Sequence, residues 1–212
     1  MLPSPGARIL LRGNMNLPNV ITLSRIPLMF VIVGLMFCAW PGAATLAFVL
    51  FIAAAVGDWL DGYLARTRGL VSSFGKLMDA MADKIMVMGI VIALVEKHKL
   101  WVSLAVITLC REFLITGMRM VAATKGVVVS ADSHGKTKTV TQLIALGLFM
   151  GAPMVARDGA SFFGWDAIHF EKNVDMAGIV VFIASTVLSV WSGYRYIARN
   201  ARLVFGDDVK PS

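Results

Sequence analysis

The sequence predicts an all-α, polytopic membrane protein with six transmembrane helices and a short N-terminal interfacial helix. Hydrophobic residues make up 58% of the 212 positions and charged residues only 16%, whereas a soluble domain has roughly 45–50% apolar and about 25% charged residues. Six mostly apolar segments approach the length of about 20 residues that a helix needs to cross a bilayer. These predicted spans are residues 21–40, 43–64, 77–95, 100–121, 140–156 and 176–196.

The rest of the chain fits a single membrane domain over residues 1–212. Residues 1–20 form the predicted interfacial segment, and residues 199–212 a polar cytoplasmic tail. Pro18 fits the first position of a helix, where its missing N–H costs little. Pro41 and Gly42 predict a tight turn between the first two spans.

Charge predicts the orientation. The net charge of +7 is distributed unevenly over the predicted loops, and lysine and arginine favour the cytoplasmic side of a membrane protein. One side carries only Lys97, Lys99, Arg157 and Lys172. The other side is therefore predicted to be cytoplasmic, with both termini inside, and the basic balance indicates anionic lipid rather than a nucleic-acid partner.

Four aspartates near the second and third spans carry the strongest chemical signal. Asp58 and Asp61 are three residues apart near the cytoplasmic end of the second span, and Asp79 and Asp83 are four apart near the start of the third. Either spacing puts both members of a pair on one helix face. The short connection makes the two helices antiparallel neighbours, so we expect the four carboxylates to converge.

Carboxylates crowded at a membrane edge repel one another, and a hard divalent cation such as magnesium, manganese or calcium relieves the repulsion. Four of them fit a two-metal site that clamps the phosphates of a nucleotide diphosphate. Gly62 and Gly75 leave room for a close approach, and Arg66 can bind a phosphate oxygen. The structural alternative leaves the first pair in solvent and the second paired with Arg66, Arg68 or Lys76.

The spacing D-x-x-D-G-x-x-A-R-x8-G-x-x-x-D-x-x-x-D over residues 58–83 resembles the motif of the CDP-alcohol phosphotransferase family at all eight fixed positions. The resemblance implies a six-helix membrane fold, a homodimer, two Mg²⁺ ions (Mn²⁺ being the alternative), and transfer of a phosphatidyl group from a CDP-linked lipid to an alcohol. It also implies a location in a bacterial inner membrane, with the active site at the cytoplasmic face.

The same resemblance implies roles for individual residues. Asp58, Asp61 and Asp79 would bind one metal, and Asp79 and Asp83 a second, with Asp83 also the general base. The implied contacts to the CDP-lipid are Asn19, Thr22, Gly62, Arg66, Ser72 and Gly75.

A second group of charges concerns the acceptor. Arg111, Glu112 and Arg119 interrupt the fourth span, and ionisable residues inside a span are functional candidates. Several cations beside a metal site suit an acceptor that carries its own phosphate. The predicted acceptor-phosphate ligands are Arg25, Arg111, Arg119, Lys136 and Lys138. The structural alternative pairs Arg111 with an acidic residue and makes the two lysines topology markers.

Residues 17–25, 111–119 and 135–142 resemble the members of the family that act on glycerol 3-phosphate. This implies CDP-diacylglycerol and glycerol 3-phosphate as substrates, and phosphatidylglycerophosphate and CMP as products. Inositol phosphate, serine or another alcohol is the alternative acceptor. From other classes, a divalent-cation transporter or a scaffold stays open, although a transporter usually binds its ion near the midplane.

Overall fold

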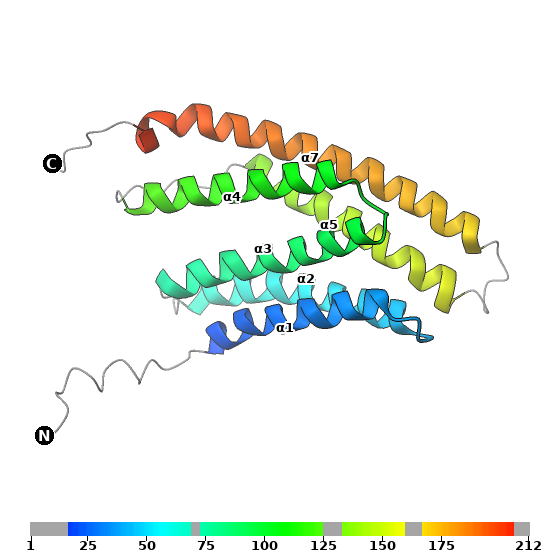
Figure 1. Cartoon of the computed structure of the whole chain (residues 1–212). Helices are drawn as coiled ribbons and strands as arrows, with labels where there is room; N and C mark the ends of the chain where they lie inside the picture. Colours follow the sequence, from blue (N-terminus) through cyan, green and yellow to red (C-terminus); the bar gives the residue numbers. More distant parts are fainter. Residues whose placement is uncertain (1–16, 69–72, 125–132, 160–166, 206–212) are drawn as a thin grey trace, which may run out of the picture.

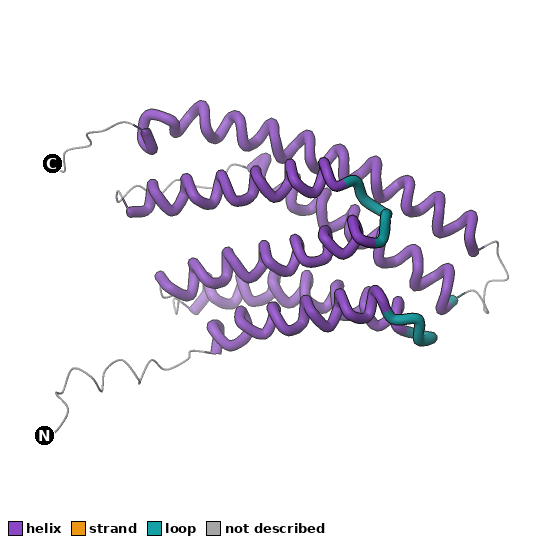
Figure 2. The backbone as a smooth tube through the Cα atoms, in the orientation of Figure 1, coloured by secondary structure: helices purple, strands orange, loops and turns teal. Residues whose placement is uncertain are grey.

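The computed structural model describes residues 17–68, 73–124, 133–159 and 167–205, with side chains described at 24–57, 81–82, 84–122, 137–159 and 168–199. Every regular element in these ranges is helical, which confirms the all-α class (Figures 1 and 2). The elements are α1 (Leu17–Phe37), α2 (Ala43–Arg68), α3 (Ser73–Glu96), α4 (Val102–Thr124), α5 (Ser133–Pro153), the π-helical segment η2 (Met154–Asp158) and α7 (Ala167–Phe205).

The helices form a bundle in which α1 packs against both α2 and α3, while α7 packs against α4 and α5. Contact between α2 and α5 joins the two groups. The main core uses large apolar side chains from α1, α2, α3, α5 and α7, namely Ile32, Phe51, Leu94, Phe149 and Phe182. The start of α1, the junction of α2 with α3, and the end of α7 lie at one end of the bundle (Figure 1).

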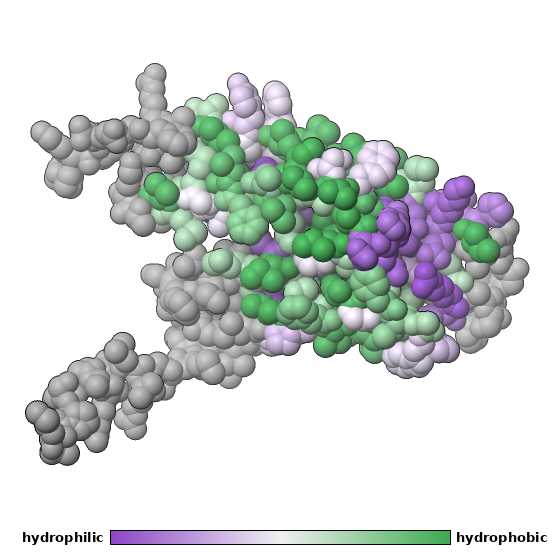
Figure 3. Space-filling view, viewed as in Figure 1, coloured by the Kyte–Doolittle hydropathy of each residue, from purple (hydrophilic) through white to green (hydrophobic). Residues whose placement is uncertain are grey.

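Much of the described surface is apolar. Two helical stretches, 137–158 and 168–199, are long and apolar enough to cross a membrane by length and composition, and 24–37 and 43–57 are shorter apolar helices. Large side chains such as Phe30, Phe113 and Val187 are more than half exposed, and apolar residues cover a broad face (Figure 3). These features indicate a membrane protein, whereas the number of six spans stays a prediction.

The helices match the predicted spans, but several are longer. Gly42 has a φ of 92° in the turn between α1 and α2, a conformation that favours glycine. The fifth helix begins at Ser133 rather than at 140, because Lys138 is buried and paired instead of ending the apolar run. The sixth continues to Phe205, so the predicted tail 199–212 begins inside α7, and residues 206–212 lie outside the described residues.

The end of α5 has a local irregularity that the apolar pattern does not show. Pro153 lacks an N–H, and the chain continues as η2, where the Gly159 amide donates to the Met154 carbonyl over 3.1 Å. This turn places Asp158 at the start of α2. Its carboxylate accepts from the amides of Gly42 at 3.0 Å and Thr45 at 2.8 Å, which stabilises the positive end of that helix.

Candidate active site

The first aspartate pair lies on a part of α2 whose backbone is helical through Arg68. Ala47, Phe51 and Ala54 form the buried stripe of this helix. At 100° per residue, Asp58 and Asp61 continue this stripe within a sector of roughly 80°. Their side chains lie outside the described residues, but their helical positions continue the line of the stripe that is buried in residues 43–57.

The second pair has the same relation to α3. Met86, Ile90 and Leu94 form a buried stripe along this helix, and Asp79 and Asp83 precede it at helical spacing, again within roughly 80°. Both helices pack against α1. Each aspartate pair thus shares one helix face, whereas the convergence of the four carboxylates and the metal site stay predictions.

The predicted CDP-lipid residues belong to the same end of the bundle. Asn19 and Thr22 lie in the first turns of α1, Gly62 and Arg66 in the last turns of α2, and Gly75 in the first turn of α3. No side chain of this group is among the described ones, and Ser72 lies outside the described residues altogether. Their contacts therefore remain predictions.

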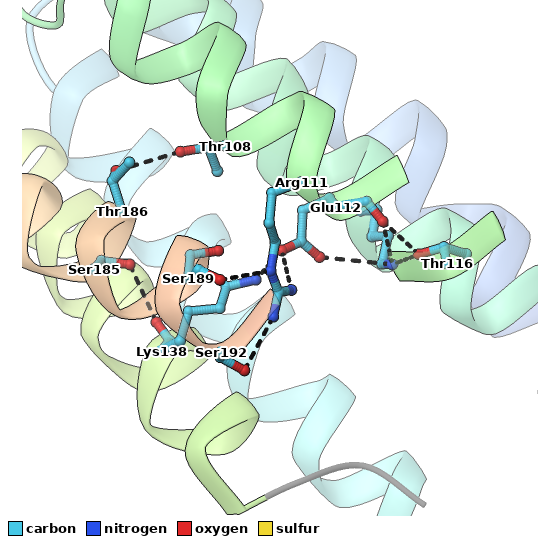
Figure 4. Close-up of polar contacts among 10 residues, drawn as sticks. Thr108, Arg111, Glu112, Thr116, Lys138, Ser185, Thr186, Ser189 and Ser192 are labelled. Carbon is cyan, nitrogen blue, oxygen red and sulfur yellow. Dashed lines mark hydrogen bonds and ion pairs between the residues drawn. The ribbon is translucent and has the colours of Figure 1, made fainter. Parts of the chain in front are cut away.

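The acceptor prediction can be compared with described side chains, because four charges, two of them buried, meet beside the α3 position of Asp83. Glu112 of α4 binds Lys84 of α3, its neighbour Arg111 and Lys138 of α5; Figure 4 labels Arg111, Glu112 and Lys138. We call these four residues the Glu112 cluster. The Oε1 atom of Glu112 is 2.9 Å from a terminal nitrogen of Arg111 and also contacts the ammonium of Lys138.

The guanidinium of Arg111 is held by three different partners. Besides its contact with Glu112, it donates from Nε to the carbonyl of Ser189 over 2.9 Å and from Nη2 to the hydroxyl of Ser192 over 3.3 Å. A Cβ on Gly193 would lie 3.3 Å from Arg111 Cγ, so this glycine leaves room for the side chain. The predicted structural pairing of Arg111 with an acid therefore exists, and two of its five N–H groups remain for a ligand.

Lys84 connects this cluster to the aspartate motif. It directly follows Asp83, and its ammonium donates to the Glu112 carbonyl over 3.4 Å and to the hydroxyl of Thr116. Its distance from Glu112 Oε2 is 3.6 Å. Because these contacts join α3 to α4, they set the position of the helix that carries Asp79 and Asp83.

Within the described residues, the Glu112 cluster holds three cations and one carboxylate. The side chains of Glu112 and Lys138 are 11% and 5% exposed, so little water screens the surplus of positive charge. Two buried polar atoms in this part of α5 and α7, Gln142 Nε2 and Ser189 Oγ, have no hydrogen-bond partner among the described residues. Buried polar groups usually have one. The arrangement can accept a polar, anionic ligand.

The remaining predicted acceptor ligands are more dispersed. Arg25 of α1 is buried, whereas Arg119 lies two turns beyond Arg111 on α4 and is exposed. The side chain of Lys136 lies outside the described ones. Of the predicted set, the structure brings together Arg111 and Lys138.

The sequence marked Glu112 as a functional candidate without a specific role, and it did not single out Lys84. One signal was available for both, because each is an ionisable residue within a predicted span. Their partners could not be read from spacing, since Lys138 and Glu112 are 26 residues apart and come from different helices.

Comparisons with known proteins agree with the motif. The profile of the family described as CDP-alcohol phosphatidyltransferase matches residues 15–191. A protein of Bacillus subtilis (strain 168) named "CDP-diacylglycerol--glycerol-3-phosphate 3-phosphatidyltransferase" is 40% identical over 201 residues, covering 87% of this chain and 95% of the relative.

Two further relatives carry the same name. The protein of Rickettsia bellii (strain RML369-C) is 34% identical over 182 residues, covering 85% of this chain and 93% of its own length. The protein of Salmonella choleraesuis (strain SC-B67) is 30% identical over 187 residues, covering 86% of this chain and 93% of its own length.

Proposed function

Because the chain belongs to the CDP-alcohol phosphatidyltransferase family, we propose that it transfers a phosphatidyl group from CDP-diacylglycerol to glycerol 3-phosphate. The products are phosphatidylglycerophosphate and CMP. The buried surplus of positive charge in the Glu112 cluster, beside the helix that carries Asp83, is the single observation that supports a phosphorylated acceptor.

The donor set of the aspartate motif fits hard divalent cations. It consists of carboxylate oxygens alone, which Mg²⁺ and Mn²⁺ accept as ligands. Asp58, Asp61, Asp79 and Asp83 would hold two such ions. When bound, the ions neutralise charge on the pyrophosphate of the CDP-lipid.

The residues of the chain perform the remaining tasks of the reaction. Asp83 accepts the proton from a hydroxyl of glycerol 3-phosphate, and the hydroxyl oxygen attacks the phosphorus that carries the diacylglycerol. The new P–O bond forms as the bond to CMP breaks. Asn19, Thr22, Gly62, Arg66, Ser72 and Gly75 hold the CDP-lipid.

The cluster supplies the binding energy for the acceptor phosphate. Lys138 and Arg111 both contact the same oxygen of Glu112, so a phosphate bound beside this carboxylate would meet both cations. Arg25, Arg119 and Lys136 complete the proposed set. Holding the phosphate there orients the hydroxyl toward Asp83, and such orientation accounts for much of the rate enhancement in phosphoryl-group transfer.

The protein would work in the inner membrane of a bacterium as a homodimer, with six spans, both termini in the cytoplasm and the active site at the cytoplasmic face. The start of α1 and the end of α7 lie at the same end of the bundle as the α2–α3 junction (Figure 1). This arrangement supports an active site on the side of the termini.

The reaction is tested by CMP release from CDP-diacylglycerol by the purified full chain. We expect release with glycerol 3-phosphate and Mg²⁺, and none after chelation of the metal. Inositol phosphate and serine are tested as alternative acceptors, and faster CMP release with either one would refute the assignment of glycerol 3-phosphate as the acceptor. Asp83→Asn should abolish turnover while thermal stability is retained; normal turnover would remove Asp83 from the role of base.

The acceptor site is tested by Lys138→Gln. Loss of one charge-assisted hydrogen bond to phosphate should raise the KM for glycerol 3-phosphate about 10- to 100-fold, and the KM for CDP-diacylglycerol should not change. Lys172→Gln is the matched control, because Lys172 is exposed on α7. An equal rise of both KM values in Lys138→Gln would show a general loss of structure instead.

A further inference from the structure

A second candidate binding site lies at the end of the bundle remote from the aspartate motif. It is a cavity of about 250 Å³, bordered by the end of α1, the start of α2, the α3–α4 turn and η2. Its lining includes large apolar side chains, among them Leu94, Phe149 and Met150, and it also includes three cations, Lys97, Lys99 and Arg157. Hydrophilic residues gather at this end of the molecule, next to the broad apolar surface (Figure 3).

The acidic residues around this cavity are already engaged. Both carboxylate oxygens of Asp158 accept hydrogen bonds from the start of α2. Glu171 and Asp175 both bind Lys99, at 2.7 and 2.8 Å. The cations that remain at the cavity are Lys97 and Arg157.

These two cations have weak or neutral protein partners among the described residues. Lys97 donates to the carbonyl of Met36 over 2.8 Å and lies 4.9 Å from the ring of Phe37. Arg157 is half exposed, and its ion pair with Glu171 is long, at 3.7 Å. Burial, together with the positive charges of Arg157 and Lys99, lowers the pKa of Lys97 below its usual value. The cavity therefore has a positive potential that an anion would relieve.

We propose that this cavity binds the phosphodiester headgroup of an anionic phospholipid, with the phosphate between Lys97 and Arg157 and an acyl chain against the apolar residues of the lining. Two observations favour a lipid over a free anion. The lining combines large apolar side chains with cations, and Trp40, which lines the cavity, is 58% exposed. Exposed tryptophan beside lysine and arginine is typical of the membrane–water interface.

The site is independent of the proposed reaction. It is formed at the opposite end of α2 and α3 from the aspartates, and it shares no residue with the Glu112 cluster. Loss of lipid binding would therefore leave CMP release intact, and failure of the CMP assay would not affect the lipid measurement.

The two cysteines provide a local measurement. Cys38 lines the cavity, whereas Cys110 lies on α4 away from it, and both are free and exposed. The purified full chain in neutral detergent is treated with a maleimide in the presence of dioleoylphosphatidylglycerol or dioleoylphosphatidylcholine. We expect the anionic lipid to slow the modification of Cys38 at least about fivefold relative to the zwitterionic lipid, while the rate at Cys110 is the same with both.

Two variants, Arg157→Gln and the control Lys172→Gln, test the proposed contact between Arg157 and the lipid phosphate. In Arg157→Gln the concentration of phosphatidylglycerol for half-maximal protection should rise about five- to tenfold, as expected for one cation at an anionic lipid. Lys172→Gln, which removes an exposed lysine outside the lining, should behave like the unmodified chain. Equal Cys38 rates in the two lipids, or no change in Arg157→Gln, would overturn the proposal. Protection by inorganic phosphate alone at the same concentration would overturn the assignment to a lipid.

Discussion

Replacing Glu112 by glutamine tests whether the buried charge cluster holds the bundle together. The substitution keeps the size of the side chain but removes the only carboxylate among the four residues of the cluster. Three cations on α3, α4 and α5 would then repel one another, and two of them, Arg111 and Lys138, are only 13% and 5% exposed. Removing one partner of a buried ion pair costs about 3–5 kcal/mol.

The lower end of that range applies here, because the amide oxygen of glutamine still accepts one hydrogen bond. A loss of about 3 kcal/mol corresponds to a fall in Tm of about 6–12 °C for a chain of this size. Thermal unfolding of the purified protein in one detergent, followed by intrinsic tryptophan fluorescence, measures the shift. Lys84→Gln is the matched control, since it removes one of three cations and leaves Glu112 paired with the other two.

The two substitutions should therefore differ in size, with Glu112→Gln lowering the Tm several times more than Lys84→Gln. Combining Glu112→Gln with Lys138→Gln should recover part of the lost stability, because the double variant buries fewer uncompensated charges. If the Tm of Glu112→Gln equals that of the unmodified chain, the carboxylate does not balance the three cations, and the charge assignment of the cluster is wrong.

Further predictions concern packing and pH. Gly178→Ala should lower the Tm, because its new Cβ would lie 3.1 Å from the ring of Phe149 and overpacking costs about 1–3 kcal/mol. Gly147→Ala is the control and should be neutral or stabilising, because nothing lies within 4 Å of its new Cβ. Equal changes in Tm for the two variants would contradict this packing. The folded-state pKa of Lys97 lies below the usual 10.5, so the unfolded chain binds more protons below pH 10.5 and stability rises with pH toward that value. The Tm difference between the unmodified chain and Lys97→Gln should therefore shift in favour of the unmodified chain as the pH rises, and parallel pH profiles would refute this.

The helices of this fold were predictable because they depend on local information. Each apolar run is long enough to form a helix by itself, and the Pro41–Gly42 turn follows from the backbone preferences of two residues. The errors arise where tertiary contacts extend or modify a helix. Helix α5 begins at Ser133, before the apolar run, and its first turns include Lys138, which is buried against Glu112. At its other end, Pro153 precedes a π-helical turn that an apolar pattern cannot reveal.

The two halves of the candidate site differ in the same way. The aspartate pairs could be placed from the sequence because three- and four-residue spacings determine a helix face, and the buried stripes of α2 and α3 agree with that placement. The Glu112 cluster could be predicted only as a set of charges in the fourth and fifth spans. Which cation meets which acid depends on how α3, α4 and α5 pack, and this information is spread over the whole chain.

The position of Lys84 explains why the two halves would work together. It adjoins Asp83 in the sequence, yet its ammonium is bound by Glu112 and Thr116 of α4, so a shift of α3 along the bundle has to break these contacts. The aspartates would bind cations, and the cluster has a surplus of positive charge. Moving the aspartate motif away from the Glu112 cluster would separate the acceptor phosphate from Asp83, the base that activates the acceptor hydroxyl. A displacement of about 1 Å is enough to cost orders of magnitude in rate, and the buried ion pairs oppose such a displacement most strongly where α3 and α4 meet.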